Sequence, residues 1–310
     1  MKKKVLSLVL ALSMVSALFA GCGSTGSTTN ETKEETTSEA ESEAAETEAP
    51  SEAEEADAEE PVEIQVFIAA SLSAVMEEVA AAYNEEHPNV TITYNADSSG
   101  TLMTQIEEGY ACDVFFSAAQ KQMNTLEEEG YVVDGTRANV VNNQVVVVKL
   151  KDTETAVTSL ETIGSAESIA LADGSVPVGK YTRTALMNLG ILAETDDPSA
   201  YTTEEVSDAL GGVEISEQGN VSKVRTAVVE GSCEVGTTYY SDTYGFEDQL
   251  EIIEFVSYDL TGNVIYPVAQ ITNDEASEAE TAAAADFVAF ITSDTAKAIF
   301  DTYLFDTNVE

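Results

Sequence analysis

The sequence predicts an α/β fold, because strand and helix patterns alternate through residues 61–310. Two of the strands run directly into serines at the start of a helix. Each half of the region also carries a similar phrase, in which a helix ends in Glu-Gly before a cysteine and a strand. The alternation predicts largely parallel sheets, and the repeated phrase favours two similar lobes. A ligand would then lie between the lobes, beyond the carboxyl ends of the strands.

Apolar runs and breaker residues place the elements in order along the chain. The first part is predicted to contain strands at 64–70, 90–94, 113–117 and 144–149, and helices at 72–85, 101–109, 119–129 and 158–164. The second part is predicted to contain strands at 168–172, 235–239, 251–256 and 264–271, and helices at 179–190, 203–211, 221–230, 276–291 and 294–303.

The serines at the helix starts are the first candidate functional residues. Ser71 ends the first strand, and Ser99 precedes the helix at 101–109. Helix starts expose unpaired backbone N–H groups and a partial positive charge, so two such starts with hydroxyl groups indicate a small-anion site. Each serine alone is better explained as a helix cap. Two further helix starts, at Gly179 and Val221, favour the anion site over capping.

Residues suited to catalysis are scarce in this sequence. His87 is the single histidine and stands before a proline at the polar end of a helix, where we expect a surface residue. A Ser-His-Asp triad and a His/Cys metal site are therefore not expected, and no GxxxxGK phosphate loop is present. We expect a binding protein rather than an enzyme, without a cofactor or a metal-cation site.

The first residues read as a secretory signal. Lys2, Lys3 and Lys4 precede an apolar stretch from Val5 to Ala20, and small residues lead to Cys22. Residues 1–21 are predicted to be a signal peptide. Residues 22–60 are rich in Ser, Thr, Ala and Glu, and this composition is typical of a solvated, unfolded tether.

Charge and cysteine content set further expectations. The chain has 57 acidic and 13 basic residues and a net charge of −44, which argues against nucleic acid as a partner. Screening over roughly 8 Å still permits a small anion to be bound by local dipoles. Cys112 and Cys233 are expected to be small buried residues, although a disulfide between them stays open at this point.

Several phrases together resemble the molybdate-binding proteins of bacterial ABC importers. They include Ala69-Ala-Ser-Leu72, Ser98-Ser-Gly-Thr-Leu102, Asp113-Val-Phe-Phe-Ser117, Val176-Pro-Val-Gly-Lys-Tyr181, Asn220-Val221 and Tyr266-Pro-Val-Ala269. The segment Leu18-Phe-Ala-Gly-Cys22 resembles a lipobox, which implies a lipid on Cys22. The resemblance covers nearly all of residues 62–305.

The resemblance implies a two-lobed type II periplasmic-binding-protein fold, with a mostly parallel sheet flanked by helices in each lobe and the ligand in the cleft. Lobe 1 would comprise 62–143 and 262–310, and lobe 2 would comprise 144–261. Binding positions would fall on these residues, with Tyr240 as the alternative to the last: Ser71, Ser99, Val178, Val221 and Tyr239.

The function implied is capture of molybdate, and also tungstate, by a monomeric lipid-anchored extracytoplasmic protein that serves an ABC permease. Because none of the proposed ligand groups titrates near neutrality, affinity should be nearly flat from about pH 6 to 9. The alternatives are a binding protein for sulfate, phosphate or an organic anion on the same fold, a lyase-like enzyme on this fold, and a sensor or adhesion module.

Overall fold

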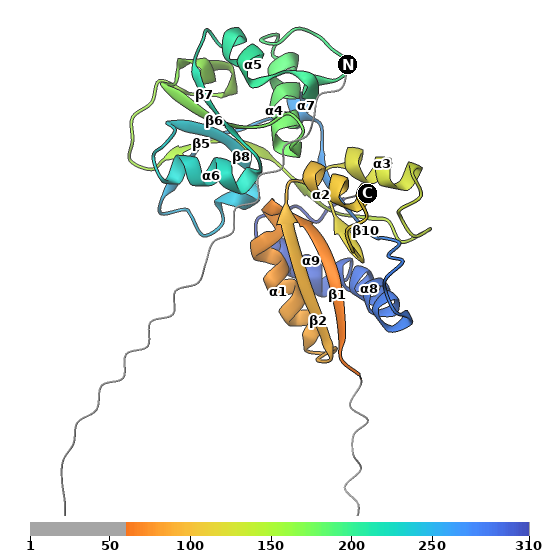
Figure 1. Ribbon diagram of the computed structural model, residues 1–310. Helices are drawn as coiled ribbons and strands as arrows, with labels where there is room; N and C mark the ends of the chain where they lie inside the picture. The colour runs from red at the N-terminus through yellow and green to blue at the C-terminus, as the bar shows by residue number, and fades with distance from the viewer. Residues whose placement is uncertain (1–59, 310) are drawn as a thin grey trace, which may run out of the picture. The chain divides into compact units, whose positions relative to one another are not determined.

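The computed structural model describes residues 60–309, in which the strands form two five-stranded sheets (Figure 1). The first sheet has the order β2-β1-β3-β10-β4, and its strands are β1 (Val62–Ala69), β2 (Val90–Asp97), β3 (Val114–Phe116), β4 (Ala138–Asn143) and β10 (Val264–Gln270). The second has the order β7-β6-β8-β5-β9, and its strands are β5 (Val145–Leu150), β6 (Ser168–Ala172), β7 (Glu214–Gln218), β8 (Val235–Tyr239) and β9 (Leu250–Phe255).

Helices flank both sheets, so each sheet with its helices is called a lobe. Lobe 1 carries η1 (Ala70–Leu72), α1 (Ser73–Asn84), α2 (Ser99–Glu107), α3 (Gln120–Glu128), α8 (Glu278–Ile291) and α9 (Asp294–Thr302). Lobe 2 carries η2 (Leu160–Ser165), α4 (Pro177–Asn188), η3 (Pro198–Ala200), α5 (Thr203–Ala209), α6 (Val221–Val229), η4 (Tyr240–Thr243) and α7 (Tyr258–Thr261).

The predicted two-lobed α/β fold is confirmed, although each sheet is mixed rather than mostly parallel. β1 pairs in parallel with β2 and β3, whereas β10 pairs antiparallel with β3 and β4. In lobe 2, β6 pairs in parallel with β7 and β8, whereas β5 pairs antiparallel with β8 and β9. β5 and β10 are the strands by which the chain enters each sheet from the other lobe. They therefore run opposite to the strands that end at the cleft.

Two strands and one short helix were missed in the sequence. β4 contains three asparagines and β7 is a largely exposed edge strand with two glutamates, and both residue types are depleted in strands. Helix α7 has only four residues. The helix predicted at 158–164 is the 3-10 helix η2. In each case partners in the folded chain outweigh weak local propensity.

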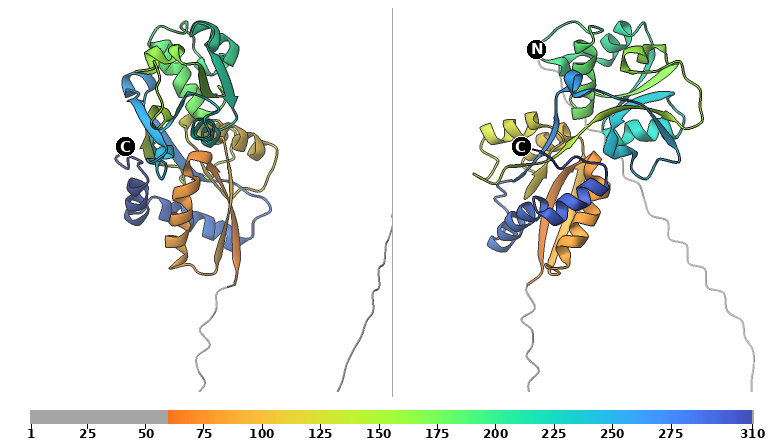
Figure 2. Two further views of the ribbon diagram at one scale, coloured as in Figure 1. Left: turned by 90° about the vertical axis from the view of Figure 1, so that its left-hand side faces the viewer. Right: turned by 180° about the vertical axis from the view of Figure 1, so that it is seen from behind.

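Strand β1 of the lobe 1 sheet is buried on both faces over its second half. Val66 and Ile68 of β1 belong to a core that includes Tyr83, Phe287 and Phe300 from α1, α8 and α9. Phe67, between them, points to the opposite cluster with Leu102 and Met123 of α2 and α3. Figures 1 and 2 show α1, α8 and α9 on one side of the sheet. A strand buried on both faces explains the continuous apolar run and gives the segment after it a rigid base.

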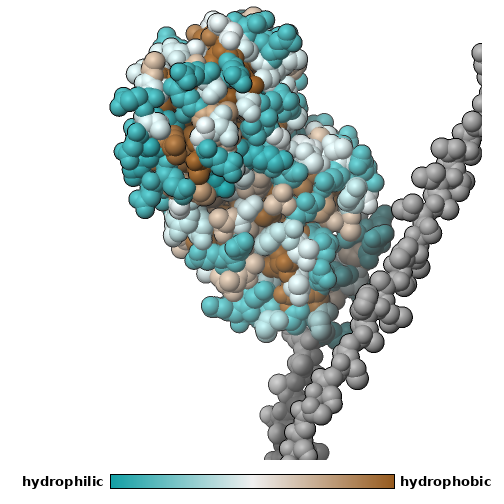
Figure 3. All heavy atoms as spheres, turned by 60° about the vertical axis from the view of Figure 1, so that its left-hand side comes forward, coloured by the Kyte–Doolittle hydropathy of each residue, from teal (hydrophilic) through white to brown (hydrophobic). Residues whose placement is uncertain are grey.

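Few large apolar side chains are exposed on the surface of the described residues. On the face drawn in Figure 3, hydrophobic residues lie in small spots among hydrophilic ones. Tyr110 and Phe255 are the large apolar side chains most exposed in residues 60–309. Within this range no helix is long and apolar enough to cross a membrane. The predicted signal peptide, Cys22 and the acidic tether lie outside the described residues.

The two cysteines of the folded region are buried free thiols. Cys112 is 2% exposed and Cys233 is 4% exposed, and no disulfide joins them. Burial raises the pKa of both thiols. They behave as small core residues, as the sequence favoured.

Candidate oxyanion site

All five residues proposed from the sequence line one cavity at the meeting of the lobes. Its wall comes from the ends of strands and the starts of helices in both lobes. The lining residues are Ala69, Ala70, Ser71, Asp97, Ser98, Ser99, Ala118, Val176, Pro177, Val178, Val221 and Tyr239. The free space between the lobes there is about 10 Å³, which is close to the room that one water molecule needs.

Ser99 is not the N-cap of α2, so helix capping does not explain a serine at this position. Ser98 is the N-cap of α2, and its hydroxyl accepts a hydrogen bond from Thr101 N at 3.1 Å. Ser99 is fully buried, and its Oγ accepts a hydrogen bond from Ala118 N at 2.9 Å. Because that bond uses Ser99 Oγ as an acceptor, the hydroxyl hydrogen stays available to a guest.

Ser71 also caps no helix. It lies inside η1, whose N-cap is Ala69, and no side chain caps that helix. Its Oγ is 2.9 Å from the hydroxyl of Tyr266, and the residue is 9% exposed. The structure therefore places both serines at the cavity with their hydroxyl groups outside any local helix cap.

Lobe 2 contributes two helix starts through apolar residues. Pro177 opens α4 and Val178 follows it, while Val221 opens α6 after the N-cap Asn220. Asn220 Oδ1 accepts a hydrogen bond from Lys223 N at 3.0 Å. Val178 and Val221 are buried. Since the first N–H groups of a helix have no intrahelical partner, these positions offer backbone donors and positive dipole ends to the cavity.

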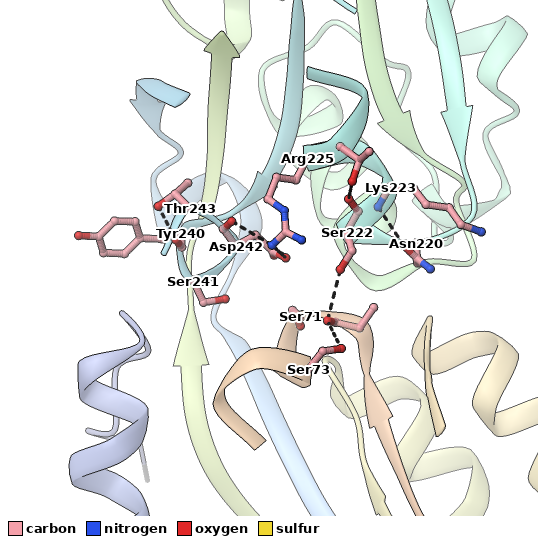
Figure 4. Close-up of polar contacts among 12 residues, drawn as sticks. Ser71, Ser73, Asn220, Ser222, Lys223, Arg225, Tyr240, Ser241, Asp242 and Thr243 are labelled. Atoms are coloured by element: carbon pink, nitrogen blue, oxygen red, sulfur yellow. Dashed lines mark hydrogen bonds and ion pairs between the residues drawn. The ribbon is translucent and has the colours of Figure 1, made fainter. Parts of the chain in front are cut away.

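Tyr239 has a hydroxyl group without a hydrogen-bond partner among the described residues. The side chain is 1% exposed, it lines the cavity, and burial raises its pKa well above the ordinary tyrosine value. Tyr240, the alternative, lies outside the cavity lining, and its ring packs against Phe255 at 4.9 Å between centroids. Figure 4 shows Tyr240 directed away from Ser71. A buried hydroxyl group left unpaired is costly, which favours a guest at Tyr239.

Asp97 is the charged side chain in the lining, and the sequence argument did not assign it a role. Its Oδ1 accepts hydrogen bonds from Ser98 N at 2.7 Å and from Asn220 Nδ2 at 3.2 Å. The second bond joins the lobes. Of the residues in 60–309, no Lys, Arg or His lines the cavity. Its position at the end of β2 was the available signal, because side chains there reach the same sheet edge as Ser71.

Arg225 of α6 contacts Asp242 beside the cavity and does not line the cavity itself. Arg225 Nη1 lies 3.9 Å from Asp242 Oδ1 and donates to the Asp242 carbonyl at 3.3 Å (Figure 4). Its guanidinium lies over the Phe246 ring. Asp242 is buried, and this burial raises its pKa to about 6, against the opposing effect of Arg225. Both residues line a second cavity of about 150 Å³ next to Ser71.

Direct contacts between the lobes surround the site. Ser222 Oγ of α6 donates to the carbonyl of Ala70 at 3.3 Å, and Ser73 Oγ donates to the same carbonyl at 2.9 Å (Figure 4). The Ser222–Ala70 bond and the Asn220–Asp97 contact join the two lobes, whereas the Ser73–Ala70 bond lies within lobe 1. The arrangement is that of a clamp closed over a small cavity.

His87 lies outside the cavity lining and is not simply a surface residue. Its side chain is 34% exposed, and its Nε2 lies 3.1 Å from Asp286 Oδ2. Its ring stacks on Tyr83 with centroids 4.3 Å apart. Among the described residues, no group of His, Cys, Asp and Glu could hold a metal ion.

A pair of α/β lobes with a cavity walled by helix starts and hydroxyl groups from both lobes defines a solute-binding protein. Residues 64–306 match the bacterial extracellular solute-binding protein family, and the chain belongs to this family. Such proteins serve ABC transporters and are not enzymes, so the expectation of a binding protein is confirmed.

The chain is similar to molybdate-binding proteins of two bacteria. It is 31% identical to ModA of Escherichia coli over 216 residues, which cover 66% of this chain and 76% of the relative. It is 28% identical to ModA of Haemophilus influenzae over 248 residues, which cover 77% and 88%. These relatives agree with the family resemblance noted in the sequence.

Solved structures share the fold. The periplasmic molybdate-binding protein of Azotobacter vinelandii has a TM-score of 0.63 at 20% identity, over 78% of this chain and 98% of that one. The sulfate-binding protein SubI of Mycobacterium tuberculosis also has a TM-score of 0.63, at 15% identity, over 79% and 86%. At these identities the likeness shows the two-lobed architecture alone.

Proposed function

We propose that this protein captures molybdate, and also tungstate, and delivers it to an ABC permease. The oxyanion would occupy the cavity between the lobes. Ser71, Ser99 and Tyr239 would donate hydroxyl hydrogen bonds, and Val178 and Val221 would donate backbone N–H groups. The observation that carries this proposal is the Tyr239 hydroxyl, which is buried against the cavity without a partner among the described residues.

The donor set suits an anion that only accepts hydrogen bonds. Each bond to a charged group contributes on the order of 1.5–3 kcal/mol, so five donors can offset the desolvation of a small dianion without a cation. Since no Lys, Arg or His of residues 60–309 lines the cavity, fixed dipoles would be the source of affinity.

Size is the proposed basis of selection between molybdate and sulfate. Both are tetrahedral dianions, and sulfate is the smaller. In a closed clamp of fixed donors a smaller anion leaves some donors unpaired, which is costly in a buried site. The names of the two ModA relatives support molybdate, while the similar fold of a sulfate-binding protein makes sulfate the rival ligand.

The same proposal places the protein outside the cytoplasm as a lipid-anchored monomer. Cleavage before Cys22 and lipidation of its sulfur would anchor the chain, and the acidic segment 23–60 would act as its tether. A Cys22→Ala variant is expected to leave the membrane fraction. Retention of that variant in the membrane would contradict the anchor and leave the ligand proposal untouched.

Calorimetry with molybdate, tungstate, sulfate and phosphate tests the ligand. We expect tight binding of molybdate and tungstate, with sulfate at least 100-fold weaker, or about 2.7 kcal/mol. Native mass spectrometry of the purified protein should show the mass of a retained oxyanion. Tight sulfate binding without molybdate binding would overturn the proposal.

A further inference from the structure

A chain of buried hydrogen bonds connects the crossing between the lobes to Ser71. Asn143 is the last residue of β4, where the chain leaves lobe 1. Its Nδ2 donates to Ser241 Oγ of lobe 2 at 2.8 Å and lies 3.2 Å from the Tyr266 hydroxyl of lobe 1. That hydroxyl lies 2.9 Å from Ser71 Oγ. All four residues are buried.

Backbone groups fix the orientation of the Asn143 side-chain amide. Asn143 Oδ1 accepts hydrogen bonds from Gln144 N at 2.9 Å and from Ser241 N at 3.4 Å. A backbone N–H can only donate, so the oxygen of the amide must face these two groups. The nitrogen therefore faces Tyr266, and the hydrogen bond between them runs from Asn143 to Tyr266.

This direction is passed on to Ser71. A phenol carries a single hydrogen, and burial raises the pKa of Tyr266 so that it keeps this hydrogen. Within residues 60–309, the hydrogen-bond partners of the Tyr266 hydroxyl are Asn143 Nδ2, which donates, and Ser71 Oγ. Tyr266 thus donates to Ser71. The hydrogen of Ser71 is left for another acceptor, and Ser71 lines the cavity.

The second serine is held in the same state by a different group. Ala118 N donates to Ser99 Oγ at 2.9 Å, and a backbone donor cannot reverse. Both seryl oxygens therefore accept a hydrogen bond from the protein, and both hydroxyl hydrogens can point to a guest. For Ser99 the direction is fixed by the main chain, whereas for Ser71 it depends on two side chains.

We propose that Asn143 and Tyr266 are positioning residues that hold Ser71 as a hydrogen-bond donor toward the oxyanion and so favour fully ionised oxyanions. The inference rests on the proposed function. An anion that keeps a proton, such as hydrogen phosphate, needs an acceptor for it. At Ser71 such an anion meets a hydroxyl group that already donates, so its proton has to go to another acceptor of the lining, such as the Asp97 carboxylate, whereas molybdate needs no acceptor.

The positioning also depends on lobe 2. Ser241 holds both ends of the Asn143 amide, because its N–H donates to Oδ1 and its Oγ accepts from Nδ2. Ser241 belongs to η4, directly after the cavity residue Tyr239. The orientation of Ser71 in lobe 1 is therefore set through a residue of the other lobe.

A Tyr266→Phe variant removes the donor to Ser71 with little change of shape. We expect its affinity for molybdate to fall by about 10- to 100-fold, the effect of one misdirected hydrogen bond to a charged group. Its affinity for inorganic phosphate at neutral pH should fall less or rise, because Ser71 can then accept a proton. The molybdate-to-phosphate affinity ratio, measured by calorimetry, is the readout that a merely structural role would not move.

An Asn143→Asp variant reverses the chain of donors. The carboxylate accepts the hydrogen of Tyr266, which makes Ser71 donate to Tyr266 and removes it as a donor to the anion. We expect a larger loss of molybdate affinity than in Tyr266→Phe. In a background that already carries Tyr266→Phe, Asn143→Asp should cost several-fold less molybdate affinity than it does in the wild type. The reversal of donors needs the Tyr266 hydroxyl group, which the double variant lacks.

A Tyr83→Phe variant is the matched control. Tyr83 is a buried tyrosine of the same lobe whose hydroxyl donates to Asp286, and it does not line the cavity. It should keep the affinity ratio. If wild-type protein binds molybdate and Tyr266→Phe keeps both the affinity and the ratio, the positioning role is wrong. If wild-type protein binds no molybdate, the proposed function itself fails. Should Asn143→Asp not fold, the ratio in Tyr266→Phe decides alone.

Discussion

Gly100 of α2 and Ser175 of lobe 2 approach so closely that a Cβ atom at position 100 would lie 2.9 Å from the Ser175 carbonyl oxygen. Real Cβ atoms essentially never come that close to another atom, and the obstacle is backbone rather than a flexible side chain. Gly100 directly follows Ser99, and Ser175 precedes the helix start that carries Val178. The closed arrangement of the two lobes therefore requires a residue without a side chain at position 100.

A Gly100→Ala variant should weaken molybdate binding without weakening the fold. The methyl group would keep the lobes from closing fully, and we expect at least a tenfold loss of affinity. Alanine in a helix is favoured over glycine by about 0.8–1.0 kcal/mol, so the ligand-free protein should be as stable as wild type or more stable. Calorimetry and thermal unfolding measure the two effects. A parallel loss of affinity and stability would contradict the explanation.

A Tyr239→Phe variant should lose affinity and keep stability. The hydroxyl has no partner among the described residues, so its removal costs the ligand-free protein no hydrogen bond. Molybdate would lose one donor, which corresponds to a roughly 10- to 100-fold weaker affinity. Tyr240→Phe is the matched control, because its ring packs on Phe255 outside the cavity. If the two substitutions changed molybdate affinity equally, Tyr239 would not be a ligand of the anion.

An Asp97→Asn variant should bind molybdate more tightly. The carboxylate lines the cavity and repels a dianion, while an amide oxygen can still accept from Ser98 N and Asn220 Nδ2. Repulsion between nearby unit charges is on the order of 1 kcal/mol in water, so we expect a gain of about three- to tenfold. Glu108→Gln, an exposed change at the end of α2, controls for net charge. Weaker binding by Asp97→Asn would show that its interlobe contact outweighs its charge.

Local signals made part of the site predictable from the sequence. Ser71, Ser99 and the openings of α4 and α6 stand where strand patterns give way to helices, and Pro177 at the first turn marks a helix start. The resemblance then supplied Tyr239, because no local pattern separates it from Tyr240. The exposure of one tyrosine to the cavity and the packing of the other on Phe255 depend on strands far apart in the sequence.

Long-range contacts made the rest unpredictable. The chain of hydrogen bonds from Asn143 through Tyr266 to Ser71 joins residues of β4, β10 and η1. These residues are far apart in the sequence, so no local pattern predicts the contacts. The position of Asp97 near a helix start could be seen in the sequence. Its contact with Asn220 could not be predicted, because it forms only where the two lobes meet. The mixed sheets follow from how β5 and β10 enter their lobes, which is a property of topology rather than of apolar periodicity.

Asp242 modifies the flat pH dependence of affinity predicted between about pH 6 and 9. Its pKa is raised to about 6, so the carboxyl becomes protonated near the lower end of that range. Above pH 7 it stays ionised, and the groups proposed to bind the anion do not titrate. We therefore expect molybdate affinity to be flat from about pH 7 to 9 and to change below pH 7. The Asp242→Asn variant should abolish the change at the acidic end in calorimetry.

The same carboxyl group should give the fold a distinct acid dependence. The pKa of Asp242 is raised from 3.8 to about 6 by burial, with Arg225 opposing the shift. Below about pH 4 both folded and unfolded forms hold the proton, so the raised pKa then carries no free-energy cost. Between about pH 4 and 6 the unfolded chain ionises first, and the contribution of Asp242 to stability falls by about 3 kcal/mol, since one pKa unit is 1.36 kcal/mol. Denaturant unfolding of wild type and Asp242→Asn across pH 4–7 measures this, and the difference between them should move in favour of Asp242→Asn as pH rises to 6 and then level off. A difference that stays constant over this range would show that Asp242 keeps an ordinary pKa in the fold.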